Sequence, residues 1–220
     1  MAGAANTFDG GTPGTSITPA NSGGASGTPF SAANTSYAAT PGMQGAACAI
    51  VPALNAGWVE HPLSGTGTRW VRAYNRPSDY SFGLVDLHLA NGNYIRVDVN
   101  DGFIALTSSN GSAETWVASQ AFTPEGWMRV ELQASASASS TATARIYTDP
   151  DSETPAIQLT GVVASGGTWR AARYGGSNDA NAAWYFDSVA WSDTGWIGPL
   201  HDLRPQPVIR SGAAHRAASW

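Results

Sequence analysis

Three stretches of alternating sequence place aromatic, Arg, Asp and His side chains at every second position. They lie in Arg69–Asn75, Ser81–Leu89 and Tyr94–Val99, and alternate residues of a strand share one face. If the three strands are neighbours, one sheet surface carries Trp70, Arg72, Tyr74, Asp86, His88, Tyr94, Arg96 and Asp98. Aromatic rings stack on the apolar faces of sugars, while charged groups bond their hydroxyls. The same set also suits a subunit interface, or a solvated face with cross-strand ion pairs. We predict a patch that contacts glycan or a neighbouring subunit.

The chemistry of hydrolysis is harder to find in this sequence. A retaining glycosidase needs two carboxyl groups about 5 Å apart, which one strand supplies at positions i and i+2 or i and i+4. The Glu residues are isolated along the chain, and no Glu-x-Asp-x-x-Glu pattern joins any of them: Glu60, Glu114, Glu125, Glu131 and Glu153. A Gly-x-Ser-x-Gly elbow and a His-x-x-x-His zinc spacing are also missing. We therefore expect that the chain is not an enzyme.

Calcium is the one ion that the sequence leaves open. The stretches Asp98–Gly102 and Ser177–Asp179 offer oxygen ligands, but neither continues to the distant Glu of an EF-hand loop. Asp, Asn and Gly are equally the residues that form tight turns. We favour turns at both places, and we expect no cofactor.

Composition narrows the range of partners and locations. The chain has 220 residues and a net charge of -5, and its eleven basic residues are all Arg, spread without a basic cluster. Nucleic acid is therefore an unsuitable partner.

The first residues lack the basic and apolar regions of a secretory signal, and no apolar run approaches the roughly 20 residues of a membrane span. The single cysteine, Cys48, lies among small apolar residues and is expected to be buried and inert.

Short strands bounded by turn residues dominate the chain, and no segment has the spacing of an amphipathic helix. The dipeptides Asn91-Gly92 and Asp101-Gly102 favour tight hairpins. The Ser, Ala and Thr run from Ser135 to Thr143 is expected to be a loose loop. Besides the three stretches above, strands are expected at Ala47–Val51, Phe103–Thr107, Met128–Leu132, Ala144–Thr148, Ile157–Val163 and Trp169–Tyr174. Many short strands at this spacing predict a two-sheet antiparallel sandwich.

The strand at Trp184–Trp191 organises the rest of the sheet. It is rich in aromatic and β-branched residues and is closed by the turn Asp193-Thr194-Gly195. Strict alternation leaves both of its faces partly apolar. Either both faces are covered, or a bulge between Phe186 and Val189 brings these two side chains onto the same core.

This strand, with Ile197-Gly198-Pro199 after it, resembles the last strand of concanavalin A-like jelly-roll domains of the laminin G and glucanase type. It is most similar to the versions in virion proteins, such as minor tail proteins, of tailed phages that infect actinobacteria. The segment from Phe8 to Phe30 resembles the opening of the same domains. The resemblance implies an all-β jelly-roll sandwich whose first strand, expected near Thr15–Thr18, pairs beside the last.

One domain is expected over residues 1–199, followed by an extended tail over residues 200–220. The tail has few apolar residues, and we expect it to become ordered against another subunit through Arg204, Arg210, Arg216 and Trp220. A homo-oligomer of closed symmetry, such as a trimer, suits a virion protein.

Three functions remain open at this point. The resemblance favours a non-catalytic virion structural protein, a minor tail or capsid-decoration protein, that touches other virion subunits and a cell-surface glycan. Such a protein is assembled in the host cytoplasm and needs no signal peptide. A bacterial carbohydrate-binding module is the second, and a glucanase-like hydrolase, which lacks its carboxylates here, is the third. Fold analogy does not separate head from tail of the particle.

Overall fold

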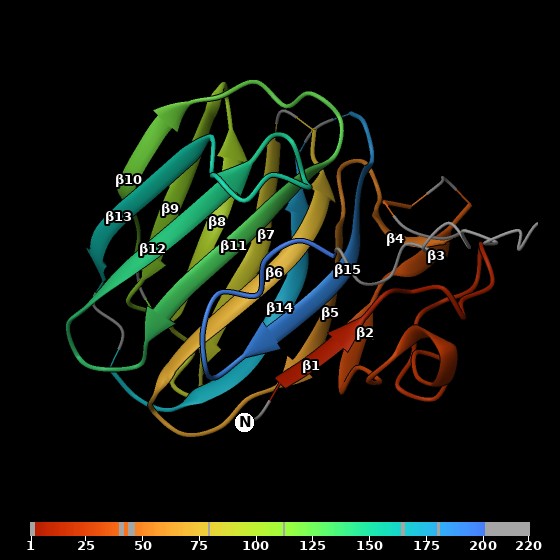
Figure 1. Cartoon of the computed structure of the whole chain (residues 1–220), viewed down its shortest axis with the longest axis horizontal. Helices are drawn as coiled ribbons and strands as arrows, with labels where there is room; N and C mark the ends of the chain where they lie inside the picture. The colour runs from red at the N-terminus through yellow and green to blue at the C-terminus, as the bar shows by residue number, and fades with distance from the viewer. Residues whose placement is uncertain are drawn as a thin grey trace, which may run out of the picture.

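The computed structural model describes residues 3–39, 42–43, 47–78, 80–111, 113–163, 166–179 and 181–200. Two antiparallel β-sheets lie face to face and enclose one hydrophobic core (Figure 1). The helical structure in these residues is one 3-10 turn, Gly24–Ser26. The prediction of an all-β, two-sheet antiparallel sandwich is confirmed.

The first sheet has eight strands in the order β13-β12-β11-β6-β15-β4-β3, with β1 also paired to β15. Its strands are β1 (Gly3–Asn6), β3 (Ser36–Ala38), β4 (Cys48–Val51), β6 (Thr68–Arg76), β11 (Met128–Ser135), β12 (Ser140–Tyr147), β13 (Ile157–Val163) and β15 (Trp184–Ser192).

The second sheet has seven strands in the order β10-β9-β8-β7-β14-β5-β2. Its strands are β2 (Ala32–Asn34), β5 (Ala56–Pro62), β7 (Tyr80–Leu89), β8 (Tyr94–Asn100), β9 (Phe103–Ser109), β10 (Glu114–Ala121) and β14 (Trp169–Asn178). The two expected hairpins are present. Asp101 and Gly102 have φ angles of 46° and 79°, as the turn between β8 and β9 requires.

Alternation places one set of side chains from each strand in the core. Ile95, Val97 and Val99 of β8 are fully buried between the sheets, so Tyr94, Arg96 and Asp98 face outward. Cys48 is buried as well, as its neighbours predicted.

A bulge in β15 resolves its apolar pattern. The register with β6 shifts between Asp187 and Ala190, and Ser188 has a φ of 48°. Phe186 and Val189 consequently both enter the core, while Asp187 turns to the outer face beside Tyr74. The bulge that the sequence left as one of two alternatives is confirmed.

The first and last strands lie side by side, but the first strand is not the expected one. β1 pairs with Val189–Ser192 of β15, whereas Ser16 in the expected strand makes one isolated bridge, to Ser36. Ile17 still packs into the core. The Thr15–Thr18 prediction was wrong because a single apolar residue between prolines marks burial as readily as a strand.

The Ser135–Thr143 prediction was wrong in part, because β11 continues to Ser135 and β12 begins at Ser140. Small side chains such as Ala142 and Ala144 are fully buried on the inner face, where the sheets leave little space. No helix among the described residues is long and apolar enough to cross a membrane.

Candidate functional site

The structure divides the eight predicted patch residues between two sheets. β6 pairs with β11 and β15, whereas β7 pairs with β8 and β14. The chain crosses from one sheet to the other between Arg76 and Tyr80. β7 and β8 are neighbours but β6 belongs to the other sheet, so Trp70, Arg72 and Tyr74 lie apart from the other five residues.

The outer face of β6 is covered by the chain itself. The segment after β15, residues 193–200, crosses this face in Figure 1, and we call it the strap. Arg72 Nη1 donates to the carbonyl of Gly198 at 2.8 Å, and Leu200 N–H donates to the Tyr74 hydroxyl at 3.0 Å. Arg72 and Tyr74 are only 3% and 1% exposed. Two of these three predicted patch residues therefore hold the strap and are closed to a ligand.

The other five residues lie on the outer face of the seven-stranded sheet, and two of them, Asp86 and Arg96, belong to one register that spans all seven strands. This row, in strand order from β2 to β10, is Ala32, Glu60, Arg173, Asp86, Arg96, Thr107 and Trp116. Acidic and basic side chains alternate at its centre. The row therefore combines cross-strand ion pairs with an aromatic end.

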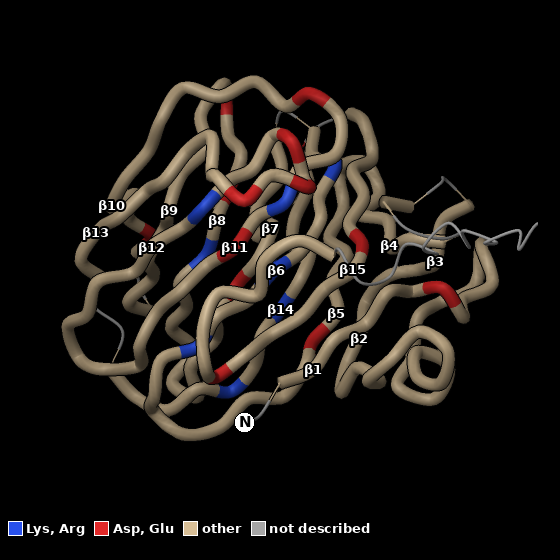
Figure 2. Tube along the Cα trace, viewed as in Figure 1, with Lys and Arg blue, Asp and Glu red and all other residues tan. Residues whose placement is uncertain are grey.

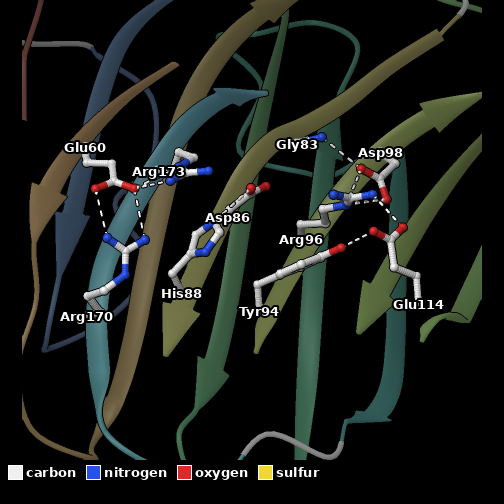
Figure 3. A network of polar contacts seen from close by, with 10 residues as sticks. All are labelled: Glu60, Gly83, Asp86, His88, Tyr94, Arg96, Asp98, Glu114, Arg170 and Arg173. Carbon is white, nitrogen blue, oxygen red and sulfur yellow. Dashed lines mark hydrogen bonds and ion pairs between the residues drawn. The ribbon is translucent and has the colours of Figure 1, made fainter. Parts of the chain in front are cut away.

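Arg96 is the centre of one half of this face (Figure 3). Its Nε lies 2.9 Å from Asp98 Oδ1, and its Nη2 lies 2.8 Å from Glu114 Oε2. The Tyr94 hydroxyl donates to the other oxygen of Glu114, and the Tyr94 ring centroid lies 4.8 Å from the guanidinium. Asp98 also accepts a hydrogen bond from Gly83 N–H at 2.8 Å. These contacts fix the exposed carboxylate of Glu114 and the Tyr94 ring in place.

The protonation of this cluster follows from its burial. Burial raises the pKa of Asp98, against the opposing charge of Arg96. Burial would lower the pKa of Arg96, but the charges of Asp98 and Asp86 outweigh it and raise that pKa. Burial and the hydrogen bond to Glu114 raise the pKa of Tyr94 to about 12, so its hydroxyl keeps its proton.

Asp86 and His88 lie beside Arg96 on β7. His88 Nε2 is 3.2 Å from Asp86 Oδ2, and the His88 and Tyr94 rings are 5.5 Å apart. Asp86 is 4% exposed, and its Oδ1 is a buried acceptor without a hydrogen-bond donor among the described residues. A buried oxygen of this kind is satisfied by an ordered water or by a small donor that reaches it.

Glu60 gathers two guanidinium groups at the other half of the face (Figure 3). Arg170 bonds both of its oxygens at 3.1 and 3.2 Å, and Arg173 Nε bonds Oε1 at 2.8 Å. Burial would raise the pKa of Glu60, but the hydrogen bonds and charges of the two Arg residues lower it overall. Arg173 also lies 4.2 Å from the ring centroid of Trp58.

Exposed aromatic rings border the Arg96 cluster. Five large apolar side chains are exposed among the described residues, and three of them, Tyr80, Phe103 and Trp116, belong to the outer face of this sheet. The Phe103 and Trp116 rings are 6.2 Å apart, and each residue is 43% exposed. Together they form an apolar platform beside Glu114.

Sequence reasoning missed Glu60, Glu114, Trp116, Arg170 and Arg173 as members of this face. β5 contains Gly57 and ends at Pro62, and β10 is polar and exposed, so neither has a strand-like pattern. Arg170 occupies the register shift between Trp169 and Ala171, which removes it from the alternation. The exposed Trp in Glu114–Ala121 was the one available signal.

The two stretches considered for calcium have structural roles. Asp98 lies against Arg96 and Gly83, and Asp101-Gly102 forms a hairpin turn. Asn178 Nδ2 donates to the carbonyls of Pro52 and Ala182. Across the described ranges, no group of three or more His, Cys, Asp or Glu side chains is placed to hold a metal ion.

Comparison with known proteins places the fold. No protein-family model matches the chain, and no curated protein matches it in sequence. The VIP36 exoplasmic/lumenal domain bound to Ca²⁺ and Man3GlcNAc matches with a TM-score of 0.50, at 12% identity over 76% of this chain and 85% of that one. Its metal-free form also gives 0.50, at 13% identity over 81% and 91% of the two chains. The fold is that of the concanavalin A-like lectins.

A galectin, LEC-6 of Caenorhabditis elegans, matches at a TM-score of 0.42, with 12% identity over 61% of this chain and 89% of that one, and is too distant to support an argument. Sequence identities this low establish the lectin-like fold alone. The predicted tail residues Arg204, Arg210, Arg216 and Trp220 lie outside the described residues, and their contact with a subunit stays a prediction.

Proposed function

We propose that this chain is a non-catalytic glycan-binding domain and that its ligand lies on the outer face of the seven-stranded sheet. The observation that carries the proposal is the exposed pair Phe103 and Trp116 beside the ordered Tyr94, Arg96 and Glu114 cluster. The fold supports it, because VIP36 has been crystallised with Man3GlcNAc.

The chemistry of this face suits a sugar. A pyranose ring offers an apolar face that stacks on Trp116 or Phe103 and a rim of hydroxyl groups. Glu114, whose side chain is 51% exposed, accepts hydrogen bonds from such hydroxyls, and the guanidinium of Arg170, 45% exposed, donates to them. Because these polar groups are already held by neighbours, binding orders few additional side chains.

Burial argues for binding rather than hydrolysis. A glycosidase brings two accessible carboxyl groups to the glycosidic bond, about 5 to 9.5 Å apart. Asp86 and Asp98 are 4% and 1% exposed, which leaves Glu114 as the accessible acid of the Arg96 cluster. We therefore expect the purified protein to release no reducing sugar from the glycans that it binds.

Removal of the aromatic platform tests the proposal. We expect wild-type protein to bind members of a printed array of neutral oligosaccharides that includes mannose and N-acetylglucosamine chains. The double variant Phe103→Ala/Trp116→Ala should bind them at least about tenfold more weakly, since each stacked ring contributes about 1 kcal/mol. Val162→Ala, an exposed apolar side chain on β13 of the other sheet, is the matched control. Equal binding by both variants, or no binding by the wild type, overturns the proposal.

We further propose that the domain acts on a phage particle, as a minor tail or decoration protein that contacts a cell-surface glycan. The support is the sequence resemblance in the Phe8–Phe30 and Trp184–Pro199 segments to virion proteins. Immunogold labelling of intact particles tests this setting and separates head from tail. Labelling that is absent from particles favours the second candidate, a bacterial carbohydrate-binding module with the same ligand face.

A further inference from the structure

A groove lies at the edge of the other sheet, away from the glycan-binding face. It is a cavity of about 790 Å³ beside β1, bounded by the loop that contains Gly27 and Pro29, by Trp191 of β15, and by Ile197 of the strap. None of the residues that line it carries a charge, and most are small or apolar. A sugar or a charged ligand finds few partners here, whereas an uncharged, extended segment of polypeptide fits.

The backbone of β1 gives the groove a hydrogen-bonding wall. β1 pairs with β15 along one edge, and on the other edge Ala5 accepts a hydrogen bond from Thr28 N–H at 2.8 Å. Alternate residues of a strand direct their backbone N–H and C=O groups to the same edge. Gly3 therefore directs its backbone groups to the same edge as Ala5, beyond the last hydrogen bond with the Thr28 loop. No further strand among the described residues pairs with β1 there. Extended peptides bind such open edges by adding a strand.

We propose that this groove receives the segment Pro205–Ile209 of the chain's own C-terminal tail. Twenty residues follow the strap, and Leu200 lies three residues beyond Ile197, which already lines the groove. Pro205 and Pro207 disfavour helix and bias their neighbours to extended backbone, and Val208 and Ile209 are β-branched. Pro205–Ile209 also contains no charged residue, which matches the uncharged lining of the groove.

Cysteine trapping in the full chain tests this docking. Ala5 lines the groove and is exposed, so Ala5→Cys is tolerated, and it is combined with Val208→Cys. The native Cys48 does not compete, because burial and the charge of Asp187 raise its thiol pKa to about 12. The matched control pairs Val208→Cys with Val162→Cys on β13, an exposed position remote from the groove.

Docking predicts that the Ala5→Cys/Val208→Cys pair forms its disulfide under mild oxidant at least about ten times faster than the control pair. A covalent monomer shows that the segment binds its own copy, and a covalent dimer shows exchange between copies; both support the assignment. Equal rates in the two pairs overturn it. Adding Ile209→Asp to the trapped pair should abolish the advantage, and an unchanged rate also counts against docking. No residue of the glycan face is altered, so the two proposals fail independently.

Discussion

At the residue scale, Arg96 holds the proposed glycan-binding face together because it lies against a buried acid. Its Nε bonds Asp98, which is 1% exposed, so Arg96→Met leaves a carboxyl group buried without its cation. We expect a loss of about 3 kcal/mol in the free energy of unfolding. The double variant Arg96→Met/Asp98→Asn should regain part of this loss, because the amide needs no counter-ion. Urea unfolding of the four proteins of this cycle measures the coupling, and additive losses would argue against it.

His61 gives a second prediction at the residue scale. It is fully buried between the Phe30 and Tyr174 rings, and burial lowers its pKa from 6.5 to about 4. The unfolded chain therefore binds a proton at a higher pH than the folded chain does. The contribution of His61 to stability is complete above pH 6.5 and is lost as the pH falls toward 4, by roughly 3 kcal/mol in all.

The variant His61→Phe isolates this effect, because a Phe ring keeps the aromatic packing and cannot be protonated. Denaturant unfolding at pH 7, 5.5 and 4 should show a smaller loss of stability in the variant than in the wild type. Parallel curves for the two proteins would mean that His61 is not protonated differently in the folded and unfolded states.

At the scale of elements, the alternation of apolar and polar residues predicted which sheet face a side chain occupies, but it did not predict which strands pair with each other. The outward set Tyr94, Arg96 and Asp98 followed directly from the buried Ile95, Val97 and Val99. The pairing of β6 with β15 and β11 did not follow from the sequence. A short link such as the one between β6 and β7 can join two neighbours of one sheet, or it can cross to the other sheet. The local sequence of the link is the same in both cases. The strap was missed for a related reason, since its hold on Arg72 and Tyr74 depends on contacts more than a hundred residues apart in sequence.

The bulge in β15 depends on the backbone conformation of Ser188, and substitutions there test it. Ser188 is 1% exposed and has a φ of 48°, a left-handed conformation that β-branched residues avoid strongly. We expect Ser188→Val to lower the free energy of unfolding by at least about 2 kcal/mol, whereas Ser188→Gly stays within about 1 kcal/mol of the wild type. Urea unfolding compares the two variants. If Val and Gly were equally stable, β15 would not need a left-handed residue at this point.

At the scale of the whole molecule, the two outer faces differ in how far the described chain covers them. The eight-stranded sheet is closed over β6 by the strap, which Glu131 also holds by accepting Gly198 N–H at 3.0 Å. Among the described residues, no segment covers Phe103 and Trp116 on the seven-stranded sheet in this way. The sandwich could be predicted from the sequence, but the accessible face could not, because accessibility depends on where the last described residues lie after the sheets have formed.

Charge on the open face leads to the final prediction. Its polar network contains three Arg residues and four acids (Figure 3): Arg96, Arg170 and Arg173, and Glu60, Asp86, Asp98 and Glu114. Basic and acidic positions are also interspersed along the whole chain (Figure 2). Most of these charges are already paired with each other, so a ligand need not supply charge. We expect the affinity for a neutral oligosaccharide to change less than about twofold between ~50 and ~500 mM NaCl, because screening acts on ligand charge that is absent. Heparin, a densely anionic polysaccharide, should bind weakly at both concentrations. Calorimetric titration at the two salt concentrations measures this, and a steep fall in affinity with salt would point instead to an anionic ligand held by Arg170 and Arg173.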